Sequence, residues 1–166
     1  MDMIITNACF LTALALLIIL GVIDLKTRLL PNKYVAAFLA IGLIFNIANG
    51  FYYTQWQEML IGMIAGAGLL LAIRYVANKI YKQDTLGLGD VKLMGAAGIW
   101  LGVDYIFLCI SIGAFAGLIH GLGYGMQQKI RTGEKINLSK LSIPAGPGFI
   151  LGIIITAFLK FVLDIL

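Results

Sequence analysis

Long apolar runs separated by short polar links dominate the 166-residue chain. Most of these runs are close to the length that an α-helix needs to cross about 30 Å of hydrocarbon. They cover residues 4–23, 34–50, 59–77, 91–103, 105–126 and 148–166. The fourth run is short, and we expect its helix to include residues of the glycine-rich segment before it. The pattern therefore predicts an all-α polytopic membrane protein, a single domain over residues 1–166 with about six transmembrane helices.

The composition and the distribution of charge support a membrane protein and predict its orientation. Hydrophobic residues make up 61% of the chain and charged residues only 12%, whereas soluble domains carry about a quarter charged residues. Eleven of the twelve Lys and Arg residues fall in or beside the links after the first, third and fifth runs, and only Lys160 lies elsewhere. Because basic links face the cytoplasm, we expect both termini to be extracytoplasmic. The net charge of +4 then reflects topology and needs no nucleic-acid partner.

Two of the eight acidic residues stand apart from the others. Asp24 follows the first run and Asp90 precedes the fourth, so the predicted topology places both at the cytoplasmic edge of the membrane. A carboxylate at the bilayer centre costs about 2.5–3.5 kcal/mol, and less near the interface. In one interpretation Asp24 forms an ion pair with Lys26 or Arg28, and Asp90 pairs in the same way with Lys92. The shared depth of the two carboxylates favours a functional pair instead.

Two neighbouring carboxyl groups are the minimum that aspartic-protease chemistry requires. Like charges a few ångströms apart do not both ionise readily, so such a pair shares a proton and titrates as a unit. The ionised group takes a proton from water while the protonated group polarises the peptide carbonyl. This chemistry needs no metal, cofactor or covalent intermediate. Gly87 and Gly89 would let the backbone turn tightly and let a substrate approach Asp90 closely.

Three segments of the chain resemble motifs of the type IV prepilin leader peptidases, which are GxGD intramembrane aspartyl proteases. They are "DLKTRLLPN" at residues 24–32, "GLGD" at residues 87–90 and "IPAGPGFILG" at residues 143–152. The resemblance implies an endopeptidase of the inner membrane that removes the basic leader of prepilins or pseudopilins at the cytoplasmic face. It implies that Asp24 and Asp90 are the catalytic pair. It also implies supporting roles for Arg28, Pro31, Asn32, Gly87, Gly89, Lys92, Pro144, Gly146 and Pro147.

The sequence departs from the longer members of this family in one respect. Those members carry a cytoplasmic insertion with paired CxxC motifs, which is linked to methylation of the new N-terminus. The two cysteines of this chain, Cys9 and Cys109, lie within apolar runs and form no CxxC pair, so neither a zinc site nor a redox motif is predicted. We therefore expect a short form without N-methyltransferase activity, similar to the peptidases of tight-adherence pilus systems.

Two other functions are consistent with paired aspartates in a membrane. An ion- or proton-coupled transporter would place them near the midplane, often between repeated halves; their position at one edge and the lack of an internal repeat disfavour it. A non-catalytic assembly subunit would use the two aspartates in ion pairs. The sequence leaves the oligomeric state and the identity of the pilin open.

Several other polar residues have structural interpretations. Arg74 lies near the end of the third run and is expected to reach the lipid headgroups, and Asp84 is expected in a polar loop. The single histidine, His120, is expected to pack as a neutral side chain. Pro31 and Asn32 predict a chain break followed by a helix cap.

Overall fold

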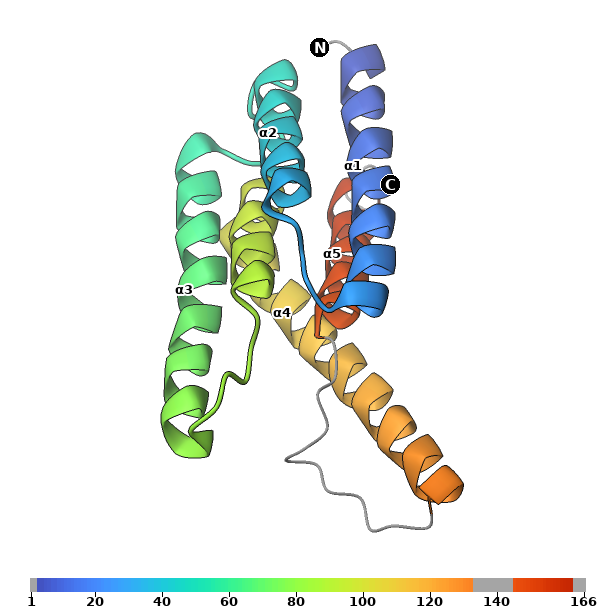
Figure 1. Cartoon of the computed structure of the whole chain (residues 1–166). Helices are drawn as coiled ribbons and strands as arrows, with labels where there is room; N and C mark the ends of the chain where they lie inside the picture. The colour runs from blue at the N-terminus through green and yellow to red at the C-terminus, as the bar shows by residue number, and fades with distance from the viewer. Residues whose placement is uncertain (1–2, 133–144, 163–166) are drawn as a thin grey trace.

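The computed structural model describes residues 3–132 and 145–162, and the regular structure in these ranges is entirely α-helical. The helices form one elongated bundle (Figure 1). They are α1 (Met3–Thr27), α2 (Asn32–Ala48), α3 (Trp56–Tyr81), α4 (Leu88–Thr132) and α5 (Gly146–Val162). The all-α prediction is confirmed for this part of the chain. The start of α4 at Leu88 also confirms that the fourth apolar run takes in residues of the glycine-rich segment.

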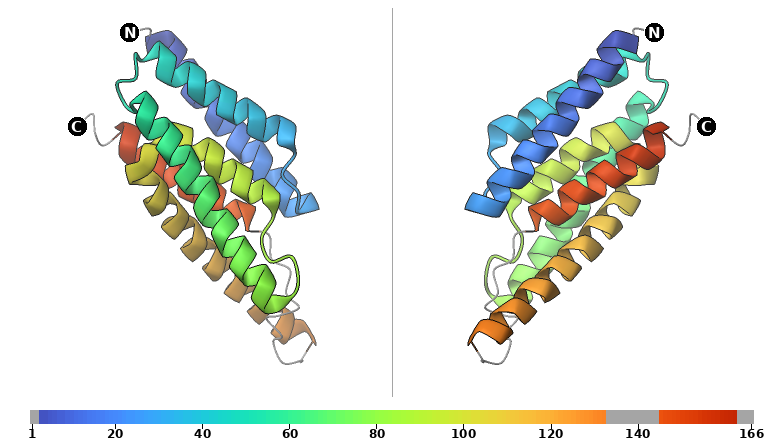
Figure 2. Two further views of the ribbon diagram at one scale, coloured as in Figure 1. Left: turned by 90° about the vertical axis from the view of Figure 1, so that its left-hand side faces the viewer. Right: turned by 90° about the vertical axis from the view of Figure 1, so that its right-hand side faces the viewer.

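Helix α4 consists of two helical arms that meet at Gly102. The backbone of Gly102 is not helical, with φ 72° and ψ −178°, and glycine adopts a positive φ without the steric cost of a Cβ atom. The first arm, residues 88–101, runs through the bundle, and the second arm, residues 103–132, returns along it and extends past the other helices (Figures 1 and 2). The fourth and fifth apolar runs are therefore two arms joined by a single residue.

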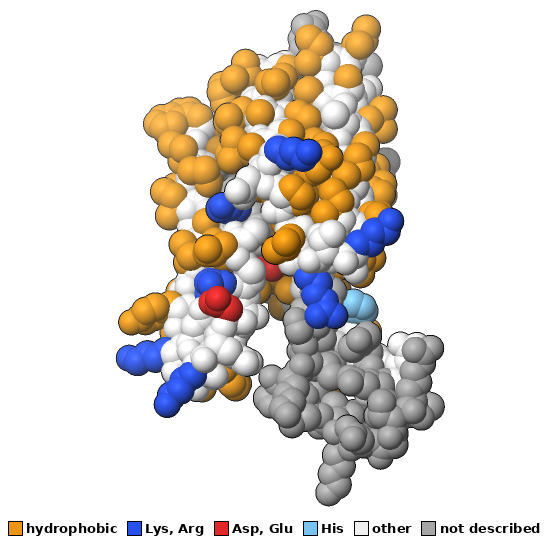
Figure 3. Space-filling view, in the orientation of Figure 1, with side chains coloured by type: hydrophobic (Ala, Val, Ile, Leu, Met, Phe, Trp, Pro, Cys, Tyr) orange, Lys and Arg blue, Asp and Glu red, His pale blue; other side chains and the backbone are white. Residues whose placement is uncertain are grey.

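Three helices are long and apolar enough to cross a membrane. These spans are Ile4–Thr27, Trp56–Tyr81 and Leu88–Gln127, whereas α2 and α5 are shorter apolar helices. Hydrophobic side chains cover most of the upper part of the face shown in Figure 3, and most of the Lys and Arg side chains lie in its middle and lower parts. Both features are those of a membrane protein. The number of crossings and the side on which the termini lie stay predictions.

The first arm of α4 is the centre of the bundle. From Asp90 to Gly102 every residue except Lys92 is buried, as expected for a helix that is apolar on all sides. Small residues bring this arm into backbone contact with α3. A Cβ atom added to Gly98 would lie 2.2 Å from the carbonyl oxygen of Gly62, so the two glycines allow the helices to approach closely.

This close approach predicts that Gly98→Ala destabilises the fold. The added methyl group meets backbone atoms of α3, which must move away, and overpacking of this kind costs about 1–3 kcal/mol. Gly68→Ala is the matched control, because Gly68 is exposed on α3 and an added Cβ meets nothing within 4 Å. Thermal unfolding in detergent should show a lower Tm for Gly98→Ala and an equal or higher Tm for Gly68→Ala. Equal Tm values for Gly98→Ala and the wild type would contradict the packing.

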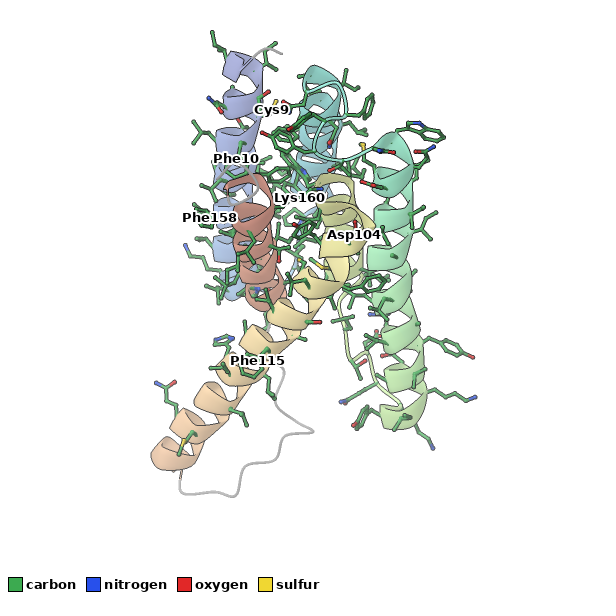
Figure 4. All side chains as sticks on the ribbon, turned by 180° about the vertical axis from the view of Figure 1, so that it is seen from behind. Cys9, Phe10, Asp104, Phe115, Phe158 and Lys160 are labelled. Atoms are coloured by element: carbon green, nitrogen blue, oxygen red, sulfur yellow. The ribbon has the colours of Figure 1, made fainter. Side chains whose placement is uncertain are left out.

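Lys160 is a buried part of the bundle. Its side chain is 5% exposed and points into the centre of the molecule (Figure 4). The Nζ atom donates to Thr54 Oγ1 at 2.6 Å and to the Leu101 carbonyl oxygen at 2.8 Å. The break at Gly102 deprives the last carbonyls of the first arm of helical partners, and Lys160 satisfies one of them. The one basic residue outside the predicted cytoplasmic links is therefore held by α4 and by the α2–α3 link.

The prediction of a packed histidine is wrong, because His120 is exposed. It lies on the second arm of α4, which extends beyond the other helices (Figure 1), so few neighbouring side chains can cover it. Nearer to Gly102 the same arm is packed against α5. A Cβ atom added to Gly113 would lie 2.7 Å from the Phe149 ring.

Candidate active site

Asp24 lies in the last turn of α1 and is 4% exposed. The helix ends at Thr27, and the next residue, Arg28, adopts a left-handed conformation with φ 55°. The Arg28 backbone N–H donates to the Asp24 carbonyl oxygen at 2.8 Å, which is a common way to end a helix. This turn directs the chain across to α2 and leaves the Asp24 side chain inside the bundle.

Asp90 is the third residue of α4 and is 7% exposed. Its carboxylate accepts a hydrogen bond from the backbone N–H of Gly87, the residue that precedes the helix. An acidic third residue that bonds the capping residue is half of a capping box, so the GLGD spacing orients Asp90 locally. Gly89 has a different role. A Cβ atom there would lie 2.8 Å from the Cβ of Leu30, so Gly89 lets the segment after Asp24 approach α4.

The two carboxylates meet at Gly146, the first residue of α5. The Gly146 N–H donates to the Asp24 carboxylate, and the N-terminal end of a helix favours a negative charge. A Cβ atom added to Gly146 would lie 2.5 Å from Oδ2 of Asp24 and 3.3 Å from Oδ1 of Asp90, so these two oxygens are at most about 5.8 Å apart, the sum of the two distances. Both oxygens are buried, and neither has a hydrogen-bond partner among the described residues.

A cavity of about 360 Å³ lies beside the two aspartates. Because a water molecule occupies about 30 Å³ in the liquid, the cavity can hold several waters or a short extended segment of a substrate. Its lining combines acidic, basic and backbone groups. It is formed by Asp24, Arg28, Arg74, Asp84, Thr85, Leu86, Gly87, Leu88, Asp90 and Ala145.

The structure does not form the ion pairs considered from the sequence. All the residues concerned are described, and no carboxylate oxygen of Asp24 or Asp90 lies within 4.0 Å of a side-chain nitrogen of Lys26, Arg28 or Lys92. The two buried carboxylates are therefore not explained as interfacial ion pairs.

Lys92 instead connects α4, which carries Asp90, to the beginning of α2. Its Nζ atom donates to Oδ1 of Asn32 at 3.0 Å, which joins the beginning of α4 to the beginning of α2. The prediction that Asn32 caps α2 is wrong by one residue, because Pro31 precedes the helix and makes no side-chain cap bond. The Pro31 carbonyl accepts the N–H groups of Tyr34 and Val35, which leaves the Asn32 side chain available to Lys92.

The segment before α5 is only partly described. Pro144 lies outside the described residues. Pro147 is the second residue of α5, where the N–H that proline lacks has no partner within the helix, so this position tolerates proline.

Two charged residues of this cavity were not recognised from the sequence. Arg74 does not simply extend to the headgroups, because its Nη2 lies 2.6 Å from Oδ1 of Asp84. Both side chains line the cavity of the two aspartates. The sequence offered one signal for Arg74, its position as the only charged residue of the third apolar run. Among the described residues no group of three His, Cys, Asp or Glu side chains is suited to bind a metal ion.

The fold and the site together define a helical membrane protein with two buried carboxylates beside a polar cavity. The sequence profile of the type IV leader peptidase family matches residues 11–122, a range that includes both aspartates. The chain belongs to the type IV leader peptidase family.

Individual relatives agree with this assignment. The chain is 32% identical over 152 residues to a prepilin leader peptidase/N-methyltransferase of Escherichia coli (strain K12), covering 90% of the chain and 61% of the relative. It is 37% identical over 92 residues to a protein of the same name from Klebsiella pneumoniae, covering 55% of the chain and 40% of the relative. The chain thus spans less than two thirds of the length of these relatives. No solved structure matches the chain significantly.

Proposed function

We propose that this protein is a membrane endopeptidase that cleaves the basic leader from prepilins or pseudopilins and that Asp24 and Asp90 are its catalytic residues. The convergence of the two buried carboxylates at Gly146 carries the proposal. Their facing oxygens have no partner among the described residues, and a cavity large enough for water and a peptide lies beside them. The names of the related peptidases supply the class of substrate.

The proposed reaction uses water as the nucleophile. Two carboxyl groups this close share one proton. The ionised group removes a proton from water as the water oxygen bonds to the peptide carbonyl carbon, and the other group donates its proton to the carbonyl oxygen. Collapse of the tetrahedral intermediate then breaks the C–N bond, with a proton passed to the departing nitrogen. The products are a leader with a free carboxyl group and a shortened protein with a new N-terminal amine.

The proposed orientation places this site at the cytoplasmic face of the inner membrane, with six crossings and both termini outside. Two links that begin with a basic residue, residues 28–31 and 82–87, follow the lower ends of α1 and α3 in Figure 1, and the N-terminal end of α1 lies at the upper end of the bundle. The aspartates lie beside these same links. A substrate with a basic leader and an apolar helix would have its junction at this boundary.

The test is cleavage of a prepilin-like substrate by the purified protein in proteoliposomes. The substrate carries a Lys-rich leader followed by an apolar segment, and a control substrate carries the same leader followed by a polar segment. Mass spectrometry should find a single new N-terminus at the start of the apolar segment and little cleavage of the control. Intact substrate with a panel of leaders, or cuts scattered along both substrates, would count against the proposal.

A further inference from the structure

The segment before Asp90 is attached to α3 by two side chains. Arg74 and Asn78 lie four residues apart, so they share one face of the helix. Arg74 bonds Oδ1 of Asp84 through Nη2 at 2.6 Å and donates to the Leu86 carbonyl through Nη1. Asn78 donates to Oδ1 of Asp84 at 3.0 Å and accepts the backbone N–H of Thr85 at 2.8 Å. Residues 84, 85 and 86 are each bonded to α3.

One peptide group connects this attachment to the proposed catalytic pair. The carbonyl of the Leu86–Gly87 peptide accepts from Arg74, and the N–H of the same peptide donates to the Asp90 carboxylate. In a planar trans peptide the C=O and N–H bonds point in opposite directions, so Arg74 and Asp90 bind opposite edges of one rigid unit. Hydrogen bonds arranged in such a chain also polarise one another.

We propose that Arg74 is a positioning residue, which fixes the Leu86–Gly87 peptide so that the Gly87 N–H holds the Asp90 carboxylate in its reactive orientation. This inference rests on the proposed function for its effect on catalysis. Arg74 acts on Asp90 through the peptide, and Asp84 and Asn78 hold the guanidinium and the neighbouring backbone in place.

The exposure of Asp84 favours this role for Arg74 over a simple contribution of the ion pair to stability. The Arg74 side chain is 18% exposed, whereas that of Asp84 is 80% exposed. An ion pair with one partner so exposed contributes little to stability because solvent screens it. An arginine within an apolar run is also costly near a membrane. The hydrogen bond to the Leu86 carbonyl gives Arg74 a specific structural role at this position.

The test compares cleavage kinetics of Arg74→Gln with those of a matched variant, Lys79→Gln. Lys79 is exposed on the same last turns of α3, so its variant removes the same charge without touching the 84–86 segment. We expect Arg74→Gln to lower kcat by about 10–100-fold with KM changed by less than about 3-fold, because small misplacement of a catalytic group has effects of this size. Lys79→Gln should match the wild type, and Arg74→Lys should recover much of the lost rate. Asp84→Asn, which spares the Leu86 bond, should lose less than Arg74→Gln.

Two kinetic results would overturn the inference while leaving the proposed function intact. The first is an unchanged kcat in Arg74→Gln, and a raised KM with it would indicate that Arg74 binds substrate directly. The second is an equal loss of kcat in Arg74→Gln and Lys79→Gln. Amide hydrogen exchange provides a readout that needs no substrate. The Thr85 and Gly87 amides should exchange faster in Arg74→Gln than in Lys79→Gln at an equal Tm. Equal exchange rates in the two variants would overturn the inference, whether or not the wild type cleaves the substrate. A wild-type protein that cleaved nothing would contradict only the proposed function.

Discussion

Asp24→Asn and Asp90→Asn are each expected to lower the rate of prepilin cleavage by about 10³-fold or more while the protein still folds and inserts. Asparagine preserves the volume of the side chain and can still accept the N–H of Gly146 or Gly87, but it cannot accept and return a proton. Because the two carboxyl groups act as one unit, the double variant should be no slower than either single variant. Single-turnover cleavage of the substrate in proteoliposomes measures all three rates.

The control for this prediction is Asp104→Asn. Asp104 is exposed and follows the break at Gly102 (Figure 4), at the other end of the first arm of α4 and so about 20 Å from Asp90 along the helix axis. Its variant should cleave at the wild-type rate. Near-normal cleavage by either Asp24→Asn or Asp90→Asn would remove that residue from the proposed mechanism.

Gly146→Ala is expected to be nearly as damaging although it removes no functional group. The new Cβ would lie 2.5 Å from Oδ2 and 2.8 Å from Cγ of Asp24. The carboxylate must therefore move off the Gly146 N–H and away from Asp90, and a displacement of about 1 Å in a catalytic group can cost about 10²-fold in rate. We expect kcat to fall by about 10²-fold with a Tm near that of the wild type.

Gly21→Ala is the matched control for this substitution. Gly21 lies one turn before Asp24 on α1, and an added Cβ there meets only the Cδ1 atom of Ile150 on α5, at 3.7 Å, which is an ordinary contact. Its variant should retain wild-type cleavage. If Gly146→Ala cleaves as well as Gly21→Ala, the two carboxylates do not react in the arrangement seen here.

The helical regions and the closeness of Asp24 to Asp90 could be anticipated from local patterns. An apolar run of sufficient length predicts a membrane helix without information from the rest of the chain. Two aspartates at the same predicted depth can then meet once the bundle forms. Depth, however, does not determine partners. The sequence could not show that Arg74 turns toward the Leu86 carbonyl, because that contact depends on how the α3–α4 link folds back.

The break in α4 illustrates a second limit of sequence patterns. The apolar runs divide at Asp104, so a break in this region was predicted. Gly102, however, is one of 20 glycines, several of which allow helices to approach closely, and the sequence does not single it out as the reversal point. Its conformation is supported by a residue far along the chain, since Lys160 bonds the Leu101 carbonyl. The cap of α2 failed for a related reason, because Asn32 bonds Lys92 across the bundle rather than its own helix.

The shortness of the first arm of α4 has a consequence for the depth of its ends in the membrane. At 1.5 Å per residue the arm over residues 88–101 is about 20 Å long, whereas the hydrocarbon layer is about 30 Å thick. On the proposed topology its two ends cannot both reach the surfaces of an unperturbed bilayer. Because the other helices surround the arm, protein rather than lipid covers the shortfall, and an end of the arm lies beneath the headgroups. The polar cavity beside Asp24 and Asp90 would then carry water, and the polar leader of a substrate, to the level of Asp90.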